Sequence, residues 1–291
     1  MYLLYTKYAD VSKMLTPVLR SESPVLCGKV VNMNISILFA NMLGGREFLG
    51  SAYGEINFGG DVLDKYIEII AGQSPDILSL AEVHLDDDTH SEMVEEIAKK
   101  LNMPFYDFMG ADKSHLAEGK ILGNAILSKY PITKKDHFIV TSPGIEVDRP
   151  NGDHWVMHDK GAQTAHIDVG EKTIALTSLH YFPFHHFNRK MNEPEFAPQR
   201  QMVVDHLRTN DAGTVPIITG DFNNKGFILR EAFPELFDAG FSEAIEAETT
   251  IVGDKQQLDH ILYRSSDCSV IDSGILQIPS DHFAIRATIE I

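Results

Sequence analysis

Six polar residues border the apolar runs of this sequence in positions that suit metal-assisted chemistry. Asn41, Glu82, His180 and Asp221 each follow an apolar run of strand length, and Asp259 and Asp281 each stand at the start of one. Functional groups are often carried where the strands of a sheet end. Acids, histidines and amides that converge there could hold a divalent cation beside an electrophilic phosphorus. Hard oxygen ligands favour Mg²⁺ or Mn²⁺ as that cation.

The segments that must position these residues alternate between strands and helices. Asp61 is the predicted cap of one helix, and Thr89 with Glu92 forms a capping-box pattern that predicts a second. Helical spacing predicts a third helix over 195–208, and the Pro- and Gly-containing stretch 141–160 indicates a loop or an exposed hairpin. Apolar runs predict strands at 34–40, 76–81, 121–128, 134–141, 162–169, 173–179, 215–219, 258–263, 269–277 and 283–290. We therefore expect mixed sheets covered by helices.

Short motifs follow one another in a fixed order along the chain. They are Asn41 after the first strand, Leu80-Ala81-Glu82-Val83, Gly123-Asn124 through Tyr130-Pro131, Gly220-Asp221-Phe222-Asn223, Leu258-Asp259-His260-Ile261 and Ser280-Asp281-His282. A lone Gly-Asp-Phe-Asn or Ser-Asp-His is usually a turn or a cap. All of them in this order resemble the endonuclease/exonuclease/phosphatase superfamily, from about residue 33 to the end.

The resemblance implies a fold and a type of chemistry. The fold is a four-layer α/β sandwich, in which two stacked mixed β-sheets are flanked by helices. Residues 33–291 would form this domain, and residues 1–32 would be an N-terminal extension of unknown role. Members of the superfamily include deoxyribonucleases, abasic-site endonucleases, inositol-polyphosphate phosphatases, neutral sphingomyelinases and deadenylases. Such breadth identifies the reaction, not the substrate.

The resemblance also assigns residues to a metal site. Glu82 would be the principal metal carboxylate, with Asn41 and Asp281 completing or neighbouring the site. Lys160 is similar to a basic residue that lies near the phosphate in sphingomyelinase-like members, and it would bind substrate.

The remaining site residues would act on water and on the phosphoryl group. By resemblance, Asp221 would orient or deprotonate the attacking water, and Asn223 would hydrogen-bond that water or a phosphate oxygen. His282 would stabilise charge on the phosphoryl group, while Asp259 would hold its imidazole and raise its pKa. His180 stands where relatives carry a His or Tyr that contacts the scissile phosphate.

Other polar or aromatic residues have two interpretations. Asn124 could bend a strand or brace the site. We interpret His154 and His158 as residues of a solvated loop rather than as a second metal site, and His84 and His260 as packed or surface histidines. The aromatic segment 181–187 could line a substrate pocket or touch lipid, but packing is the favoured interpretation.

The charge of the chain bears on its substrate. Lys plus Arg number 25 against 42 Asp plus Glu, which gives a formal net charge of -17. Because non-specific nucleic-acid binding depends on Lys and Arg, this balance favours a small-molecule or lipid-headgroup phosphate over a nucleic acid. A Mg²⁺-dependent nuclease remains the alternative, since Lys129, Lys134 and Lys135 could form a local basic edge. A non-catalytic binding protein on the same fold is a third possibility.

The cysteines and the N-terminal residues give a few further expectations. Cys27 and Cys268 lie far apart and outside any Cys-x-x-Cys spacing, which fits a reducing, cytoplasmic setting. The first thirty residues contain no apolar run long enough for a signal peptide or a membrane span. Apolar residues at helical spacing from Leu4 to Val18 could form a short docking segment, but a loosely attached extension before Met33 is the favoured interpretation.

Overall fold

A computed structural model describes residues 32–149, 152–210 and 212–291 of the chain. The expectations for Leu4 to Val18, for Cys27 and for the N-terminal extension fall outside these residues, so they stay predictions. Among the residues that the structure describes, no helix is long and apolar enough to cross a membrane.

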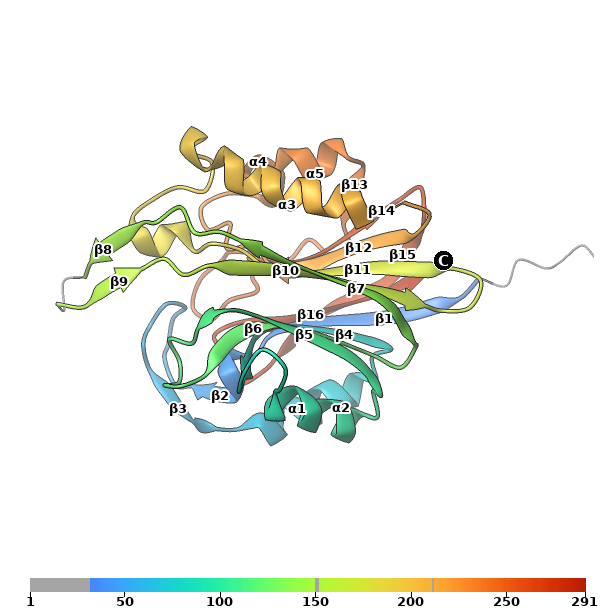
Figure 1. The fold of residues 1–291 in the computed structure, drawn as a ribbon, viewed down its shortest axis with the longest axis horizontal. Coiled ribbons are helices and arrows are strands. Elements are labelled where there is room, and N and C mark those ends of the chain that lie inside the picture. The colour runs from blue at the N-terminus through green and yellow to red at the C-terminus, as the bar shows by residue number, and fades with distance from the viewer. Residues whose placement is uncertain (1–31, 150–151, 211) are drawn as a thin grey trace, which may run out of the picture. The chain divides into compact units, whose positions relative to one another are not determined.

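Two mixed sheets of six strands each lie face to face (Figure 1). The first sheet has the order β15 (Ser269–Gln277), β16 (Phe283–Glu290), β1 (Asn34–Asn41), β4 (Ile77–Leu85), β6 (Ile121–Ser128) and β5 (Phe105–Lys113). The second has the order β13 (Phe241–Glu243), β14 (Asp259–Arg264), β12 (Val215–Asp221), β11 (Thr173–His180), β10 (Lys160–Asp168) and β7 (Ile132–Val140). Their inner faces form one apolar layer, which includes Ile37, Phe39, Leu176 and Ile217.

Helices cover the outer face of each sheet, which confirms the four-layer sandwich expected from the sequence (Figure 1). The first sheet is covered by α1 (Leu63–Gln73) and α2 (Glu92–Leu101), and the second by α3 (Ala197–Asn210), α4 (Leu229–Ala232) and α5 (Pro234–Asp238). Strand β1 shows why its sequence is apolar throughout. Ile37 and Phe39 pack between the sheets, whereas Leu38 and Ala40 pack under the helices.

Local sequence signals explain the starts of the first two helices. The prediction that Asp61 caps the first helix was one residue early, because the N-cap is Val62; the Asp61 carboxylate still accepts a hydrogen bond from the backbone N–H of Leu63, 2.9 Å away. The prediction that Thr89 caps the second helix was wrong, because Ser91 is the cap and its hydroxyl accepts from the Val94 N–H at 3.1 Å. Thr89 instead bonds the carboxylate of Asp87.

Several elements were not predicted from the sequence. Strand β5 carries polar and glycine residues among its apolar ones, so it shows no continuous run. Within 141–160, the short hairpin of β8 (Glu146–Asp148) and β9 (His154–Val156) agrees with the exposed-hairpin interpretation. The remaining short elements are β2 (Arg46–Phe48), β3 (Phe58–Asp61) and the 3₁₀ turns η1 (Leu43–Gly45), η2 (Phe184–Phe187) and η3 (Pro194–Phe196).

Polar contacts join the two sheets inside their shared apolar layer. The Asn124 amide on β6 donates to the backbone oxygens of Gly161, at 3.0 Å, and Ser178, at 3.4 Å, both on the second sheet. The Thr219 hydroxyl on β12 donates to the Ser79 hydroxyl on β4 at 2.7 Å. Because buried polar groups must find partners, these bonds fix how one sheet is placed on the other. Asn124 therefore braces the region of the site, and it does not simply bend a strand.

The bond between Thr219 and Ser79 can be tested by removing one or both hydroxyls. Thr219→Val keeps the side chain's shape but leaves a buried serine hydroxyl without this donor, so we expect the free energy of unfolding to fall by about 1–3 kcal/mol. In urea unfolding, the double variant S79A/T219V should lose less than the sum of the two single variants, because neither hydroxyl is then left buried alone. Strictly additive losses would show that the bond does not couple the sheets.

Candidate active site

Strand register brings the predicted residues of the second sheet into one row. Gly161 pairs with His180, His180 with Asp221, and Asp221 with Asp259, on four neighbouring strands. Strands β11 and β12 are parallel, so His180 and Asp221 are both carboxyl-terminal residues of their strands at the same edge. In the first sheet, Asn41 ends β1 in the same way.

Glu82 reaches the site differently from the prediction that it ends a strand. Strand β4 continues to Leu85, and its pairing with β6 shifts register between Ala81 and Val83. Glu82 occupies this bulge with a φ of 53°, in the left-handed region that side chains other than glycine rarely adopt. A bulge turns a side chain away from the regular alternation, and here it places the Glu82 carboxylate 3.8 Å from the imidazole Nε2 of His180.

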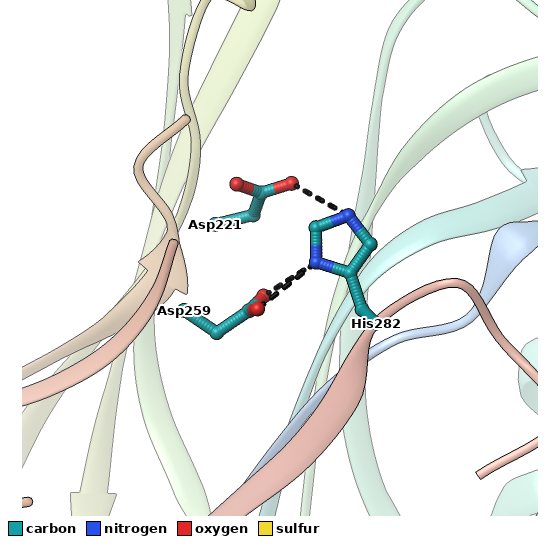
Figure 2. Close-up of side chains that lie close together, drawn as sticks. All are labelled: Asp221, Asp259 and His282. Carbon is teal, nitrogen blue, oxygen red and sulfur yellow. Dashed lines mark hydrogen bonds and ion pairs between the residues drawn. The ribbon is translucent and has the colours of Figure 1, made fainter. Parts of the chain in front are cut away.

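His282 lies between two carboxylates that come from different strands (Figure 2). Its Nδ1 is 2.9 Å from one oxygen of Asp259, and its Nε2 is 3.7 Å from Asp221 Oδ2. Burial alone would lower the pKa of His282, but the charges of Asp259 and Asp221 raise this pKa well above its usual value. The Asp259 backbone is fixed in turn, because its N–H donates to the Thr250 hydroxyl at 3.1 Å.

Asp221 is the most highly connected acid of the site. Its Oδ1 accepts from the backbone N–H of Asn223 at 2.9 Å, and its Oδ2 accepts from the Asn41 amide at 3.2 Å. Burial raises the pKa of Asp221 to about 7, while His282 opposes the rise and the charges of Asp259 and Glu82 add to it. This carboxylate can therefore exchange a proton near neutral pH.

Lys160 and His180 form a buried pair on neighbouring strands. The Lys160 ammonium lies 3.2 Å from His180 Nε2 and can donate to it. Burial lowers the pKa of both side chains, and the Lys160 charge lowers that of His180 further. His180 is thus a neutral imidazole, 3.7 Å from Asp221 Oδ2, and the structure brings Lys160 into the site as the resemblance implied.

Two sets of residues could hold a metal. Ligand atoms of Asp221, Asp259 and His282 lie within 4.8 Å of one another, which makes this cluster a possible metal site. The predicted set is instead Glu82, Asn41 and Asp281. Burial raises the pKa of Asp281, and repulsion from Glu82 adds to the rise. Both carboxylates line the same cleft. Such a pair suits a hard divalent cation, which would offset their repulsion.

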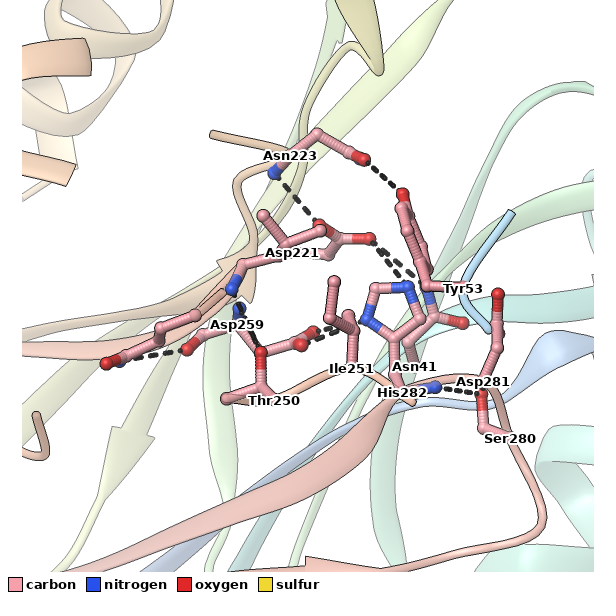
Figure 3. A network of polar contacts seen from close by, with 12 residues as sticks. Asn41, Tyr53, Asp221, Asn223, Thr250, Ile251, Asp259, Ser280, Asp281 and His282 are labelled. Atoms are coloured by element: carbon pink, nitrogen blue, oxygen red, sulfur yellow. Dashed lines mark hydrogen bonds and ion pairs between the residues drawn. The ribbon is translucent and has the colours of Figure 1, made fainter. Parts of the chain in front are cut away.

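Tyr53 is a site residue that sequence reasoning missed (Figure 3). It lies between β2 and β3, in a segment without helical or strand periodicity, and its hydroxyl donates to Asn223 Oδ1 at 3.1 Å. His185 and His186 were also missed, although the aromatic segment around them was noticed. His185 Nε2 lies 3.3 Å from the Tyr53 hydroxyl, and the His186 ring stacks on the Tyr53 ring.

A cleft of about 380 Å³ opens over these residues. The site residues that line it are Glu82, Lys160, His180, Asp221, Asn223, Asp281 and His282. Asn41 and Asp259 are not on its wall, and they act through the residues they bond. Other parts of the wall come from the segment between Tyr53 and Phe58, from β9 and from His115 and His158.

Most of the residues for which the sequence left two interpretations have packing roles in the structure. Tyr181, Phe182, Phe184 and Phe187 are buried in the apolar cluster beneath α3 and α5, as the packing interpretation predicted. His260 is buried between Glu243 and Asn224. His154 is exposed and pairs with Asp148, and His158 pairs with Asp112 at 3.1 Å.

Comparisons with known proteins show the family and the fold of this chain. The model of the Endonuclease/Exonuclease/phosphatase family matches residues 40–282. The chain belongs to this family of phosphoesterases, as its motifs indicated. A comparison with curated proteins gives no match.

Solved structures show the same fold at low sequence identity. A family protein from Leptotrichia buccalis has a TM-score of 0.65 at 17% identity, covering 88% of this chain and 100% of that one. The human Nocturnin catalytic domain, with bound sulfate, has a TM-score of 0.60 at 18% identity, covering 88% and 93%. A mannosyl-6-phosphatase from Bacteroides thetaiotaomicron has a TM-score of 0.57 at 14% identity, covering 88% and 99%.

The strained backbone at Glu82 leads to a stability prediction that needs no substrate. Glu82→Gln and Glu82→Gly both remove the charge, but only glycine relieves the left-handed backbone. In the presence of chelator, we expect the free energy of unfolding of the glycine variant to exceed that of the glutamine variant by about 0.5–1 kcal/mol. This difference is the steric strain that glycine relieves, minus the entropy that glycine loses on folding. At Glu290, in a regular strand, the same pair of substitutions should give the opposite order in urea unfolding. The same order at both positions would contradict the proposed strain.

Proposed function

We propose that this phosphoesterase hydrolyses a small-molecule or lipid-headgroup phosphate ester by direct attack of water, without a covalent enzyme intermediate. The observation that carries the proposal is the placement of Asp221. This carboxylate lines a cleft of about 380 Å³, is held by Asn41 and Asn223, and faces His282. A water molecule in the cleft could therefore lose its proton to Asp221 while a phosphoryl group lies beside His282.

The roles of these residues follow from their charge states. Asp221, with a pKa of about 7, can accept the water proton near neutral pH. His282 carries a positive charge maintained by Asp259, so it would stabilise negative charge on the phosphoryl oxygens. Lys160 would donate a hydrogen bond to the same group, and the neutral His180, whose Nε2 accepts from Lys160, would hold the ammonium in place.

Glu82 and Asp281 are the residues we propose for the metal, with Asn41 beside them. His282 fits a metal less well, because a coordinating histidine must be neutral and the pKa of His282 is raised. A bound Mg²⁺ or Mn²⁺ would supply positive charge to offset that of the carboxylates and the phosphoryl oxygens. In the protein alone, burial is the main cause of the raised pKa values of Asp221 and Asp281, and the charge of Glu82 adds to both.

The size and lining of the cleft support a small substrate. A volume of about 380 Å³ is at the lower end of the range for small-molecule pockets. Ile56, between β2 and β3, and Val156, on β9, line the cleft and are 64% and 44% exposed. They form an apolar rim suited to an ester with an apolar portion. The structurally similar mannosyl-6-phosphatase from Bacteroides thetaiotaomicron is, by its name, an enzyme of a small phosphate ester.

The lysines considered for nucleic-acid binding do not support a nuclease. Lys129 bonds the carboxylate of Asp76 at 3.2 Å, next to the start of β4 and therefore at the end opposite to Glu82. Lys135 pairs with Asp107 at 3.1 Å. A basic edge at that end of the sheet would not reach a phosphate in the cleft, and the net charge of -17 repels polyanions on average.

Removal of metal should abolish the activity. Because Glu82 and Asp281 would need a cation to act on a phosphoryl group, we expect EDTA to stop hydrolysis of bis-p-nitrophenyl phosphate and Mg²⁺ or Mn²⁺ to restore it. Mg²⁺ should also raise the thermal midpoint of the wild type but not that of Glu82→Gln. Full activity after dialysis against chelator would exclude this assignment.

Asp221→Asn should remove the proton acceptor while leaving the fold intact. We expect kcat to fall by about 10²–10⁴-fold, with a change in thermal midpoint of only a few degrees. The substrates to compare are bis-p-nitrophenyl phosphate, sphingomyelin, inositol phosphates, sugar phosphates, supercoiled plasmid and an abasic-site duplex. If the wild type cleaves DNA at physiological salt and Asp221→Asn does not, the protein is a nuclease. A variant as active as the wild type would overturn the role of Asp221.

A further inference from the structure

Tyr53 joins site residues that come from distant parts of the chain. Its hydroxyl donates to Asn223 Oδ1 at 3.1 Å and lies 3.3 Å from His185 Nε2, so the His185 N–H can donate to it. Burial, followed by the charge of neighbouring His186, lowers the pKa of His185 to about 2, and this ring is therefore neutral. The pKa of Tyr53 is raised well above its usual value, first by burial, so its hydroxyl keeps its proton. The hydrogen bonds thus run in one direction, from His185 through Tyr53 to Asn223.

The ring of Tyr53 is held as firmly as its hydroxyl. Its edge meets the His282 ring with the centroids 5.2 Å apart, and it stacks on His186 with a centroid distance of 5.6 Å. The Lys225 ammonium lies 4.9 Å from the centre of the ring. These contacts leave the ring a single position at the wall of the cleft.

The backbone that carries Tyr53 is tied to the backbone that carries His282. The Tyr53 N–H donates to the Val252 oxygen at 2.8 Å, and the Val252 N–H donates to the Asp281 oxygen at 2.9 Å. Gly253 allows this close approach, because a Cβ added there would lie 2.3 Å from the Ser51 oxygen. The position of Tyr53 is therefore set together with that of the Asp281 and His282 segment.

We propose that Tyr53 is a positioning residue, which fixes the Asn223 amide so that one of its N–H groups faces the phosphoryl group. This inference rests on the proposed function. Asn223 Oδ1 is occupied by Tyr53, and Nδ2 donates one hydrogen to the Tyr181 oxygen at 3.0 Å. The second hydrogen of Nδ2 remains for a substrate oxygen in the cleft that Asn223 lines. Without the tyrosine hydroxyl, the amide loses one of its two anchors and part of its preorganisation.

The first test is the kinetics of Tyr53→Phe, which keeps every ring contact and removes only the hydroxyl. We expect kcat for bis-p-nitrophenyl phosphate to fall by about 10- to 100-fold with KM changed less than about threefold, because the bond acts on the transition state. The matched control is Tyr263→Phe, because Tyr263 is a partly buried tyrosine on β14 that does not line the cleft. This control should keep wild-type kcat, and an equal loss in both variants would overturn the proposal.

A double-variant cycle separates action through Asn223 from a general structural role. In an Asn223→Ala background, Tyr53→Phe should lower kcat by less than about twofold, because the group it positions is gone. A full additional loss in that background would show that Tyr53 acts independently of Asn223 and would overturn the proposal.

A second pair of variants moves Tyr53 without altering any side chain of the site. Gly253→Ala puts a Cβ against the Ser51 oxygen, and Gly213→Ala is its control, because Gly213 has a similar φ of 74° but open space around it. We expect only Gly253→Ala to lower kcat with little change in KM, as Tyr53→Phe does. Circular dichroism would confirm that both glycine variants are folded. Unchanged kcat in a folded Gly253→Ala variant would argue against the need for this placement.

The proposal can also be tested without any substrate. The side-chain amide protons of Asn223, assigned in NMR spectra by their loss in Asn223→Asp, should shift and exchange faster with solvent in Tyr53→Phe than in Tyr263→Phe. If no ester in the panel is hydrolysed by the wild type, the proposed function fails, but this signal still reports whether Tyr53 holds Asn223. Unchanged amide signals in Tyr53→Phe would overturn the positioning role whatever the activity.

Discussion

The site depends on polar contacts that fix the two sheets against each other. An apolar layer such as that of Phe39 and Ile217 resists separation of the sheets, but its contacts are non-directional and would tolerate small slides. The bonds from Asn124 to Gly161 and from Thr219 to Ser79 allow only one offset. That offset matters because Glu82 belongs to one sheet and His180 and Asp221 to the other. A slide of about one residue, roughly 3.3 Å, would separate them.

Backbone strain appears at two positions that the site needs, Glu82 and Asn223, whose φ values are 53° and 52°. At Glu82 the strain comes from a bulge in the middle of a buried strand, and at Asn223 from the turn that follows Asp221. Each left-handed residue costs about 1–2 kcal/mol, so the surrounding structure must impose it. For Asn223, the bonds to Asp221, Tyr181 and Tyr53 do so. Asn223 is thus both strained and among the best anchored residues of the site.

The sequence predicted the layers and most strands because both faces of each central strand are buried, which leaves long apolar runs. The motif order predicted the family, and the predicted residues of the second sheet meet because strand register follows from the same apolar pattern. Tyr53 and the bulge at Glu82 could not be predicted in this way. A loop residue far along the chain from its partners leaves no periodic signal, and a bulge leaves the apolar pattern of β4 unchanged. Both features depend on tertiary contacts that local spacing does not encode.

Charge at the site is organised independently of the average charge of the chain. Glu82, Asp221 and Asp281 line one cleft, and burial raises the pKa of the last two. Asp259, just behind the wall, maintains a positive His282, and burial of Lys160 lowers its pKa. A phosphate ester entering this cleft would meet more acid than base unless a cation accompanied it. The acidic surface and the acidic cleft therefore select against the same ligands. The surface repels large polyanions at a distance, whereas a small ester needs its negative charge offset only within the cleft.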